Sequence, residues 1–107
     1  MIRFLVSIMT RHIKNHFYLW DKAPKYKHHY QFSQDWFTKN IRVWYRHLKL
    51  FAGKSNLKAL EVGTYEGRSA LWLLDNVLHD PSSHLVCVDP YPGNMKPFRD
   101  RFTANLK

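Results

Sequence analysis

The stretch LKALEVGTYEGRS, residues 57–69, decides the fold of this chain of 107 residues. Leu57 to Val62 is a short apolar run between polar residues and a glycine, which predicts a buried strand of a parallel sheet. Gly63 and Gly67 bracket the three residues that follow, and glycine lets a backbone turn sharply and approach a ligand closely. The sequence therefore predicts a strand that ends in a glycine turn.

A helix follows this turn, beginning near Gly67 or Arg68. Its apolar residues recur at helical spacing: Leu71, Trp72, Leu74, Val77 and Leu78. The sequence HLVCVDPYP, residues 84–92, predicts a second strand that stops at Asp89, because Pro90 disfavours a helix there. The free amide groups at the start of the helix suit the polar or negatively charged end of a ligand, with Ser69 as a further hydroxyl donor.

An acidic residue lies near the tip of each predicted strand. Asp89 follows Gly63 by 26 positions. A dinucleotide-binding unit places an acid against ribose hydroxyls at a similar spacing of about 20 residues. The sequence contains neither GxGxxG nor GxxxxGK followed by Ser or Thr, so the standard dinucleotide and phosphate-loop patterns are excluded. The pattern that is present is Glu61-x-Gly63-x-Tyr65-x-Gly67.

This pattern resembles the first motif of the class I S-adenosylmethionine-dependent methyltransferases, usually Glu/Asp-x-Gly-x-Gly-x-Gly. The sequence VCVDP, residues 86–90, resembles their second motif. The resemblance covers roughly residues 33–107. Within this family, the sequence is similar to a branch of small-molecule methyltransferases whose turn has the form Gly-x-x-x-Gly-x-Ser. It implies a Rossmann-like α/β fold, S-adenosyl-L-methionine as cofactor, and methyl transfer to an oxygen, nitrogen or carbon of an unidentified small-molecule acceptor.

The resemblance also implies roles for individual residues. Glu61 would support the turn and the methionine end of the cofactor, and Gly63 would pack against the cofactor. Asp89 would accept hydrogen bonds from the ribose hydroxyls, with Tyr91 near the cofactor's edge. Tyr65 takes the place of the usual middle glycine. The predicted cofactor-binding residues are Glu61, Gly63, Thr64, Tyr65, Gly67, Ser69, Asp89 and Tyr91.

The sequence nominates no catalytic base and no metal ligand. Glu66 and the histidines are titratable, but no motif gives them a role. His28 and His29 are adjacent, yet no HExxH motif or cysteine pair accompanies them, so we expect solvated histidines. Cys87 is the only cysteine and lies mid-strand, where a small buried hydrophobe is expected. A single cysteine permits no internal disulfide and fits a reducing, cytoplasmic compartment.

Positive charge is concentrated in the first half of the chain. The formal net charge is +9, and residues 1–54 hold 11 Lys or Arg against 2 Asp. We therefore divide the chain into a basic, aromatic-rich helical region, residues 1–54, and a partial Rossmann-like S-adenosylmethionine-binding domain, residues 55–107. Within the first region we expect a helix over residues 2 to about 18, too short to span a membrane. A connector over 19–32 and an amphipathic helix from Ser33, as N-cap, to Gly53 follow. The stripe that this helix would bury is Phe37, Ile41, Trp44, Leu48 and Phe51.

The predicted sheet is incomplete. The methyltransferase family has more strands than the two predicted here, and after them only the opening of another helix is expected from Pro97 to Lys107. We therefore interpret the chain as the N-terminal portion of such a domain. Two strands leave apolar side chains uncovered, namely Leu60, Val62, Val86 and Val88.

Two alternatives stay open. One is a basic module that binds nucleic acid or an anionic surface through residues 1–54. No nucleic-acid motif accompanies the charge, so nucleic acid is not the partner we expect. The other is an assembly partner that completes its sheet with a second chain.

Overall fold

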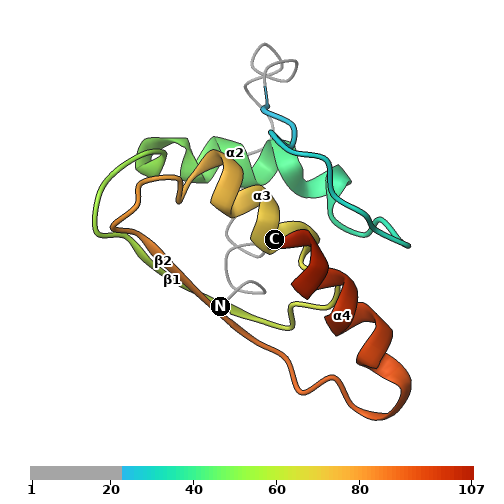
Figure 1. Cartoon of the computed structure of the whole chain (residues 1–107). Helices are drawn as coiled ribbons and strands as arrows, with labels where there is room; N and C mark the ends of the chain where they lie inside the picture. The colour runs from blue at the N-terminus through green and yellow to red at the C-terminus, as the bar shows by residue number, and fades with distance from the viewer. Residues whose placement is uncertain (1–22) are drawn as a thin grey trace.

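The computed structural model describes residues 23–107. The helix predicted over residues 2–18 lies outside this range. The order of elements is a 3-10 turn (Thr38–Asn40), α2 (Ile41–Leu48), a 3-10 turn (Lys49–Phe51), β1 (Lys58–Val62), α3 (Arg68–Asn76), β2 (His84–Val88), a 3-10 turn (Gly93–Met95) and α4 (Lys96–Asn105) (Figure 1). In the described part of the chain, no helix is both long and apolar enough to cross a membrane.

The two strands form a parallel pair connected by α3. Lys58 lies opposite His84, and the register continues to Val62 opposite Val88. A parallel pair requires a crossover connection, which the helix supplies. The predicted strand, turn, helix and strand are confirmed, and the chain is a small α/β domain. The finer Rossmann-like assignment stays a prediction.

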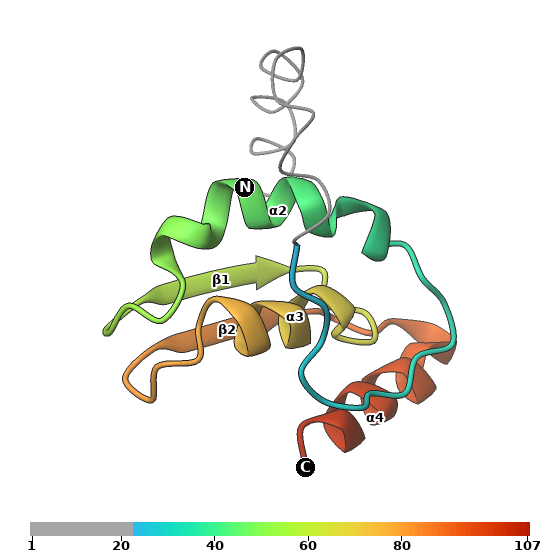
Figure 2. The same cartoon turned by 90° about the horizontal axis from the view of Figure 1, so that it is seen from above.

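The core lies between α2, α3 and one face of the sheet (Figure 2). Its buried members are Phe37, Ile41, Trp72, Val77 and Leu78. Ala59 of β1 and Leu85 of β2 pack against them from the sheet. Described residues of both predicted regions, 1–54 and 55–107, therefore share a single core.

The other face of the sheet is open. Leu60, Val62, Val86 and Val88 are 50–69% exposed, as the sequence predicted. Successive side chains of a strand point to opposite faces, so every second residue of both strands lies on this side. The open face is a continuous apolar surface.

The helix predicted from Ser33 to Gly53 differs at both ends. Its first turn begins at Thr38, whose backbone N–H donates to Asp35 Oδ1 at 2.9 Å, so Asp35 and not Ser33 provides the capping oxygen. At the other end the helix tightens into a 3-10 turn over Lys49–Phe51. Three residues per turn instead of 3.6 rotate the last side chain off the apolar stripe. Phe51, predicted to be buried, is 46% exposed.

The described part of the predicted connector, together with Ser33 and Gln34, forms a strap, residues 23–34, across the outer face of α3 (Figure 2). Residues 19–22 of the connector lie outside the described residues. Trp72 Nε1 donates to the Pro24 carbonyl at 2.9 Å. The buried Asp75 carboxylate accepts the backbone N–H of Lys27 at 2.7 Å and the hydroxyl of Tyr30 at 2.9 Å. The strap thereby supplies partners for polar groups of α3 that it removes from water.

Candidate functional site

The carboxyl ends of β1 and β2 meet at one edge of the sheet. There the glycine loop, residues 63–67, is tied to the segment that follows β2. Asp89 accepts the backbone N–H of Tyr65 at Oδ2 and that of Tyr91 at Oδ1, both at 2.9 Å. The Tyr91 hydroxyl donates to the Tyr65 carbonyl at 2.7 Å. Residues 24 and 26 positions apart in the sequence are therefore joined at this edge.

Two tyrosines at this edge have left-handed backbones. The φ angles are 53° at Tyr65 and 44° at Tyr91. Such conformations cost a non-glycine residue about 1–3 kcal/mol and cluster at binding sites, where the surrounding structure holds them. Here the Asp89 carboxylate holds both backbones.

Tyr91 is a fixed neutral donor. Burial, followed by the nearby Asp89 carboxylate, raises the pKa of the Tyr91 phenol to about 12. Its hydroxyl therefore keeps its proton at neutral pH and continues to hold the glycine loop.

Gly63 and Gly67, the two glycines of the loop, have different surroundings. Gly63 has a φ of 86°, and a Cβ built on it would meet no atom within 4 Å in the described structure. The space around its Cβ position is open, and its role in cofactor binding stays a prediction. Gly67 has a φ of 78°, but a Cβ there would lie 2.0 Å from Cδ2 of Phe102 in α4. Helix packing therefore accounts for the glycine at position 67.

The Glu61 carboxylate points into the helix-covered face of the sheet. It is buried, accepts the Ser69 hydroxyl, and lies 3.7 Å from the Cys87 thiol. Burial raises the pKa of Glu61, although the Ser69 hydrogen bond acts in the opposite direction. Ser69 was expected to donate to a ligand, but its proton is directed at Glu61.

Cys87 is half-buried beside this carboxylate. Burial raises the pKa of the Cys87 thiol, and the charge of Glu61 raises it further. Burial and the Glu61 charge both oppose formation of the thiolate, so Cys87 serves as a packing residue.

Thr64 is the one unsatisfied group at this edge. Its side chain is only 4% exposed, and Oγ1 has no hydrogen-bond partner among residues 23–107. An unsatisfied buried hydroxyl costs about 1–3 kcal/mol. The hydroxyl instead acts at longer range on the Glu61 carboxyl and the Cys87 thiol, where its effect is to lower both pKa values, and it is enclosed away from the loop surface.

An aromatic stack explains how a side chain is accommodated at the position of the usual middle glycine. The Tyr65 ring lies between Trp36, with ring centroids 5.2 Å apart, and Phe98, at 4.5 Å. Trp36 is 67% exposed and forms the outer wall of the stack. Sequence reasoning did not assign Trp36 or Phe98 to the site, since neither belongs to a recognisable motif.

Glu66 is a structural anchor. Its buried carboxylate accepts the Ser33 backbone N–H at 2.9 Å, the Ser33 hydroxyl, and the Arg101 guanidinium. Burial alone would raise the pKa of Glu66, but the hydrogen bonds from Ser33 and Arg101 outweigh it and hold the pKa below its usual value. With its oxygens occupied by the strap and α4, Glu66 is not a candidate general base.

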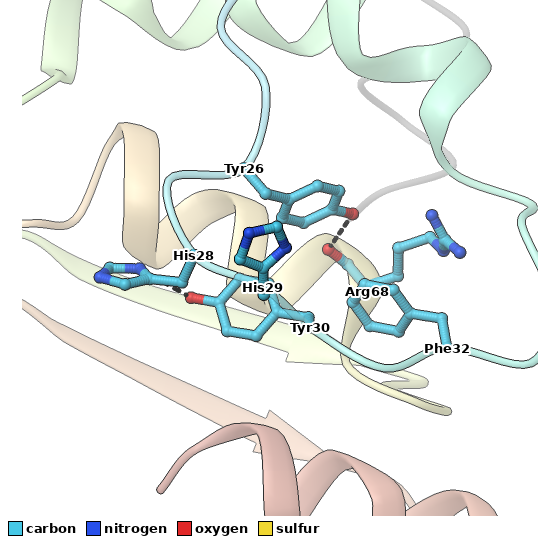
Figure 3. Close-up of a pocket in the computed structure, with 6 residues that line it drawn as sticks. All are labelled: Tyr26, His28, His29, Tyr30, Phe32 and Arg68. Atoms are coloured by element: carbon cyan, nitrogen blue, oxygen red, sulfur yellow. Dashed lines mark hydrogen bonds between the residues drawn. The ribbon is translucent and has the colours of Figure 1, made fainter.

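A separate hollow of about 310 Å³ lies beside the strap (Figure 3). Its lining consists of Tyr26, His28, His29, Tyr30, Phe32 and Arg68. Most of its polar groups are used internally: Tyr26 donates to the Arg68 carbonyl at 2.8 Å, and His28 Nδ1 lies 2.9 Å from Asp75 Oδ1. The described residues include no group of three or more His, Cys, Asp or Glu that could hold a metal.

No family model, curated protein or solved structure matches this chain. The edge where β1 and β2 end is therefore the feature of the described structure that bears on function.

Proposed function

We propose that this chain carries the cofactor-binding portion of a class I S-adenosylmethionine-dependent methyltransferase. The observation that supports the proposal best is the Asp89 carboxylate after β2, which is joined by a hydrogen bond to the glycine loop, near the open Cβ position of Gly63 and the N-terminus of α3. This arrangement offers a carboxylate and helix amides to a polar ligand that approaches closely.

The acid after β2 is suited to ribose hydroxyls. Each Asp89 oxygen accepts one backbone N–H, and a carboxylate oxygen has a second lone-pair site. Asp89 would therefore bind the ribose while it continues to hold Tyr65 and Tyr91. Glu61 would act indirectly, because its carboxylate accepts the Ser69 hydroxyl and so holds Ser69 in place at the start of α3.

When bound, the cofactor supplies an electrophilic methyl group on its sulfonium. The chain's own contribution is positioning, which is a large part of the rate acceleration in such transfers. We assign no residue of this chain as the catalytic base, and the acceptor is an unidentified small molecule.

The open sheet face supports a related proposal about assembly. Four large apolar side chains at 50–69% exposure would be covered by further strands and helices, either of a longer form of this protein or of a second chain. A reducing, cytoplasmic setting, expected from the single cysteine, stays a prediction.

The cofactor proposal is tested by calorimetric titration with S-adenosylhomocysteine. We expect saturable binding by the 107-residue chain and a loss of about 5- to 150-fold for Asp89→Asn, equivalent to about 1–3 kcal/mol. Asp80→Asn is the matched control, because Asp80 also accepts a backbone N–H, from Ser82 at 2.9 Å, but precedes β2 instead of following it. A folded chain without saturable binding would overturn the proposal.

Thr64→Val separates ligand binding from folding. Valine keeps the shape of threonine and removes the unsatisfied hydroxyl, so the ligand-free chain should be unchanged or more stable by about 1 kcal/mol. Binding of S-adenosylhomocysteine should change by less than about threefold, because the enclosed Oγ1 atom does not reach the loop surface. Thermal unfolding and titration measure the two effects, with Thr103→Val on α4 as the control threonine. A clear destabilisation of the ligand-free Thr64 variant would show that the hydroxyl already has a partner.

A further inference from the structure

The end of the domain opposite the glycine loop has an unusual surface. There the strands begin, and two loops lie side by side: residues 49–58, from the end of α2 into β1, and residues 79–84, from α3 into β2 (Figure 2). Hydrogen bonds join them, from Asn56 N–H to Ser82 Oγ at 2.8 Å and from Leu57 N–H to Ser83 Oγ at 3.0 Å. We call these two loops the basal tip.

Two bulky apolar side chains lie on this tip in contact with water. Leu50 is 71% exposed and Phe51 is 46% exposed. They are adjacent and belong to the 3-10 turn that rotates them away from the core. They are thus presented outward by the fold.

Lysines lie near this apolar pair. Lys49, Lys54 and Lys58 are exposed, and Lys54 Nζ lies 5.9 Å from the centre of the Phe51 ring. Residues 36–60 contain six Lys or Arg and no acid. A bulky apolar pair beside exposed lysines is an amphipathic surface.

The acids of the chain do little to neutralise the tip. Glu61, Glu66 and Asp75 are buried elsewhere. Asp80 is the one acid of the basal tip, and its Oδ1 accepts the N–H of Ser82 at 2.9 Å and the Ser82 hydroxyl at 2.5 Å. Three lysines against this single acid leave the tip positive.

We propose that the basal tip binds the surface of bilayers that contain anionic lipids. Leu50 and Phe51 would enter the boundary between headgroups and acyl chains, and the three lysines would pair with anionic headgroups. Apolar insertion and cationic attraction together give peripheral binding that neither gives alone. The glycine loop, at the other end of the strands, would face away from the membrane.

The apolar pair favours a bilayer over nucleic acid as the partner. Nucleic-acid backbones offer phosphates to lysine, but leucine has no ring to stack on a base. A bilayer has partners for both kinds of side chain. The proposal concerns a surface remote from the cofactor edge and does not depend on the methyltransferase assignment.

The test is co-sedimentation of the full chain with lipid vesicles. One set is phosphatidylcholine alone, and the other contains about one-third phosphatidylserine. We expect at least about tenfold stronger binding to the anionic set at about 0.05 M salt, and a large loss at about 0.5 M, where the Debye length is only a few ångströms. Neutral vesicles should bind weakly under both conditions.

Matched variants assign the binding to the tip. Leu50→Ser with Phe51→Ser should reduce binding to anionic vesicles by about tenfold or more. Lys49→Gln with Lys54→Gln should reduce it several-fold and weaken its salt dependence. Lys96→Gln with Lys107→Gln removes the same charge from exposed positions in and beyond α4 and should change little. Thermal unfolding of each variant checks that the fold is retained.

Several outcomes would overturn the proposal. They are no binding to anionic vesicles, equal binding to neutral ones, or binding that the Leu50 and Phe51 changes leave intact. Binding through the open sheet face would show this last pattern. Fluorescence anisotropy with a single-stranded RNA oligonucleotide provides a further check. Salt-sensitive RNA binding without vesicle binding would make the basic surface a nucleic-acid site instead.

Discussion

Gly67→Ala should destabilise the domain by about 2–5 kcal/mol. A left-handed backbone costs an alanine about 1–2 kcal/mol, and forcing an atom into a packed position costs a further 1–3 kcal/mol or so. Both apply, because Gly67 has a φ of 78° and its Cβ would overlap the Phe102 ring. Chemical denaturation followed by circular dichroism measures the change, and the denaturation slope shows whether unfolding stays two-state.

Gly63→Ala is the control for this substitution. Gly63 has a φ of 86° but open space around its Cβ position, so only the backbone cost of about 1–2 kcal/mol applies. In a chain with Phe102→Ala, the Gly67→Ala change should lose its steric part and cost about as much as Gly63→Ala. Equal costs for the two glycines in the otherwise unchanged chain would contradict the packing role of position 67.

Glu66→Gln should cost about 2–3 kcal/mol at neutral pH. Glutamine keeps the shape but loses the charge that receives hydrogen bonds from Ser33 and Arg101, and such charge-assisted bonds contribute about 1.5–3 kcal/mol. Arg101 is partly exposed, so water recovers some of its interaction. Asp100→Asn, which breaks an exposed pair with Arg99 on the same helix, should cost less than about 1 kcal/mol.

The effect of Glu66 should depend on pH in a defined direction. Its folded-state pKa lies below the ordinary value of 4.5, so its contribution is fully present above about pH 5.5 and disappears as pH falls through the lowered pKa. The stability difference between the wild-type chain and Glu66→Gln should therefore shrink between about pH 5 and pH 3. A difference that stays constant over this range would show that the carboxylate charge is not what holds the strap.

The strand-tip edge could be predicted because its signals are local. The apolar run before Gly63 and the Pro90 after Asp89 fix where both strands end, and parallel strands bring those ends together. The same alternation of side chains predicted which apolar residues the incomplete sheet would leave exposed. In these segments local pattern and tertiary structure agree.

The rest depended on contacts that no short window of sequence contains. Nothing in the connector sequence shows that Ser33 would pair with Glu66 or that Tyr30 would bond Asp75. Likewise, the stack of Trp36 on Tyr65 joins segments from opposite sides of β1. Phe51 is exposed because the last turn of the helix is a 3-10 turn. The 3.6-residue periodicity of the apolar residues does not predict this change of turn.

The strap has a consequence for how the chain folds during synthesis. Its hydrogen bonds to the rest of the domain join residues 32 to 74 positions apart, from Gln34 with Glu66 to Gln31 with Asn105. Closing loops of this length costs chain entropy before the contacts form, so we expect the strap to dock after β1, α3 and β2 have assembled. Although the strap leaves the ribosome before every element it touches, its final partner Asn105 emerges last. The backbone N–H of Gln31 must therefore stay hydrated until almost all of the described sequence has been translated.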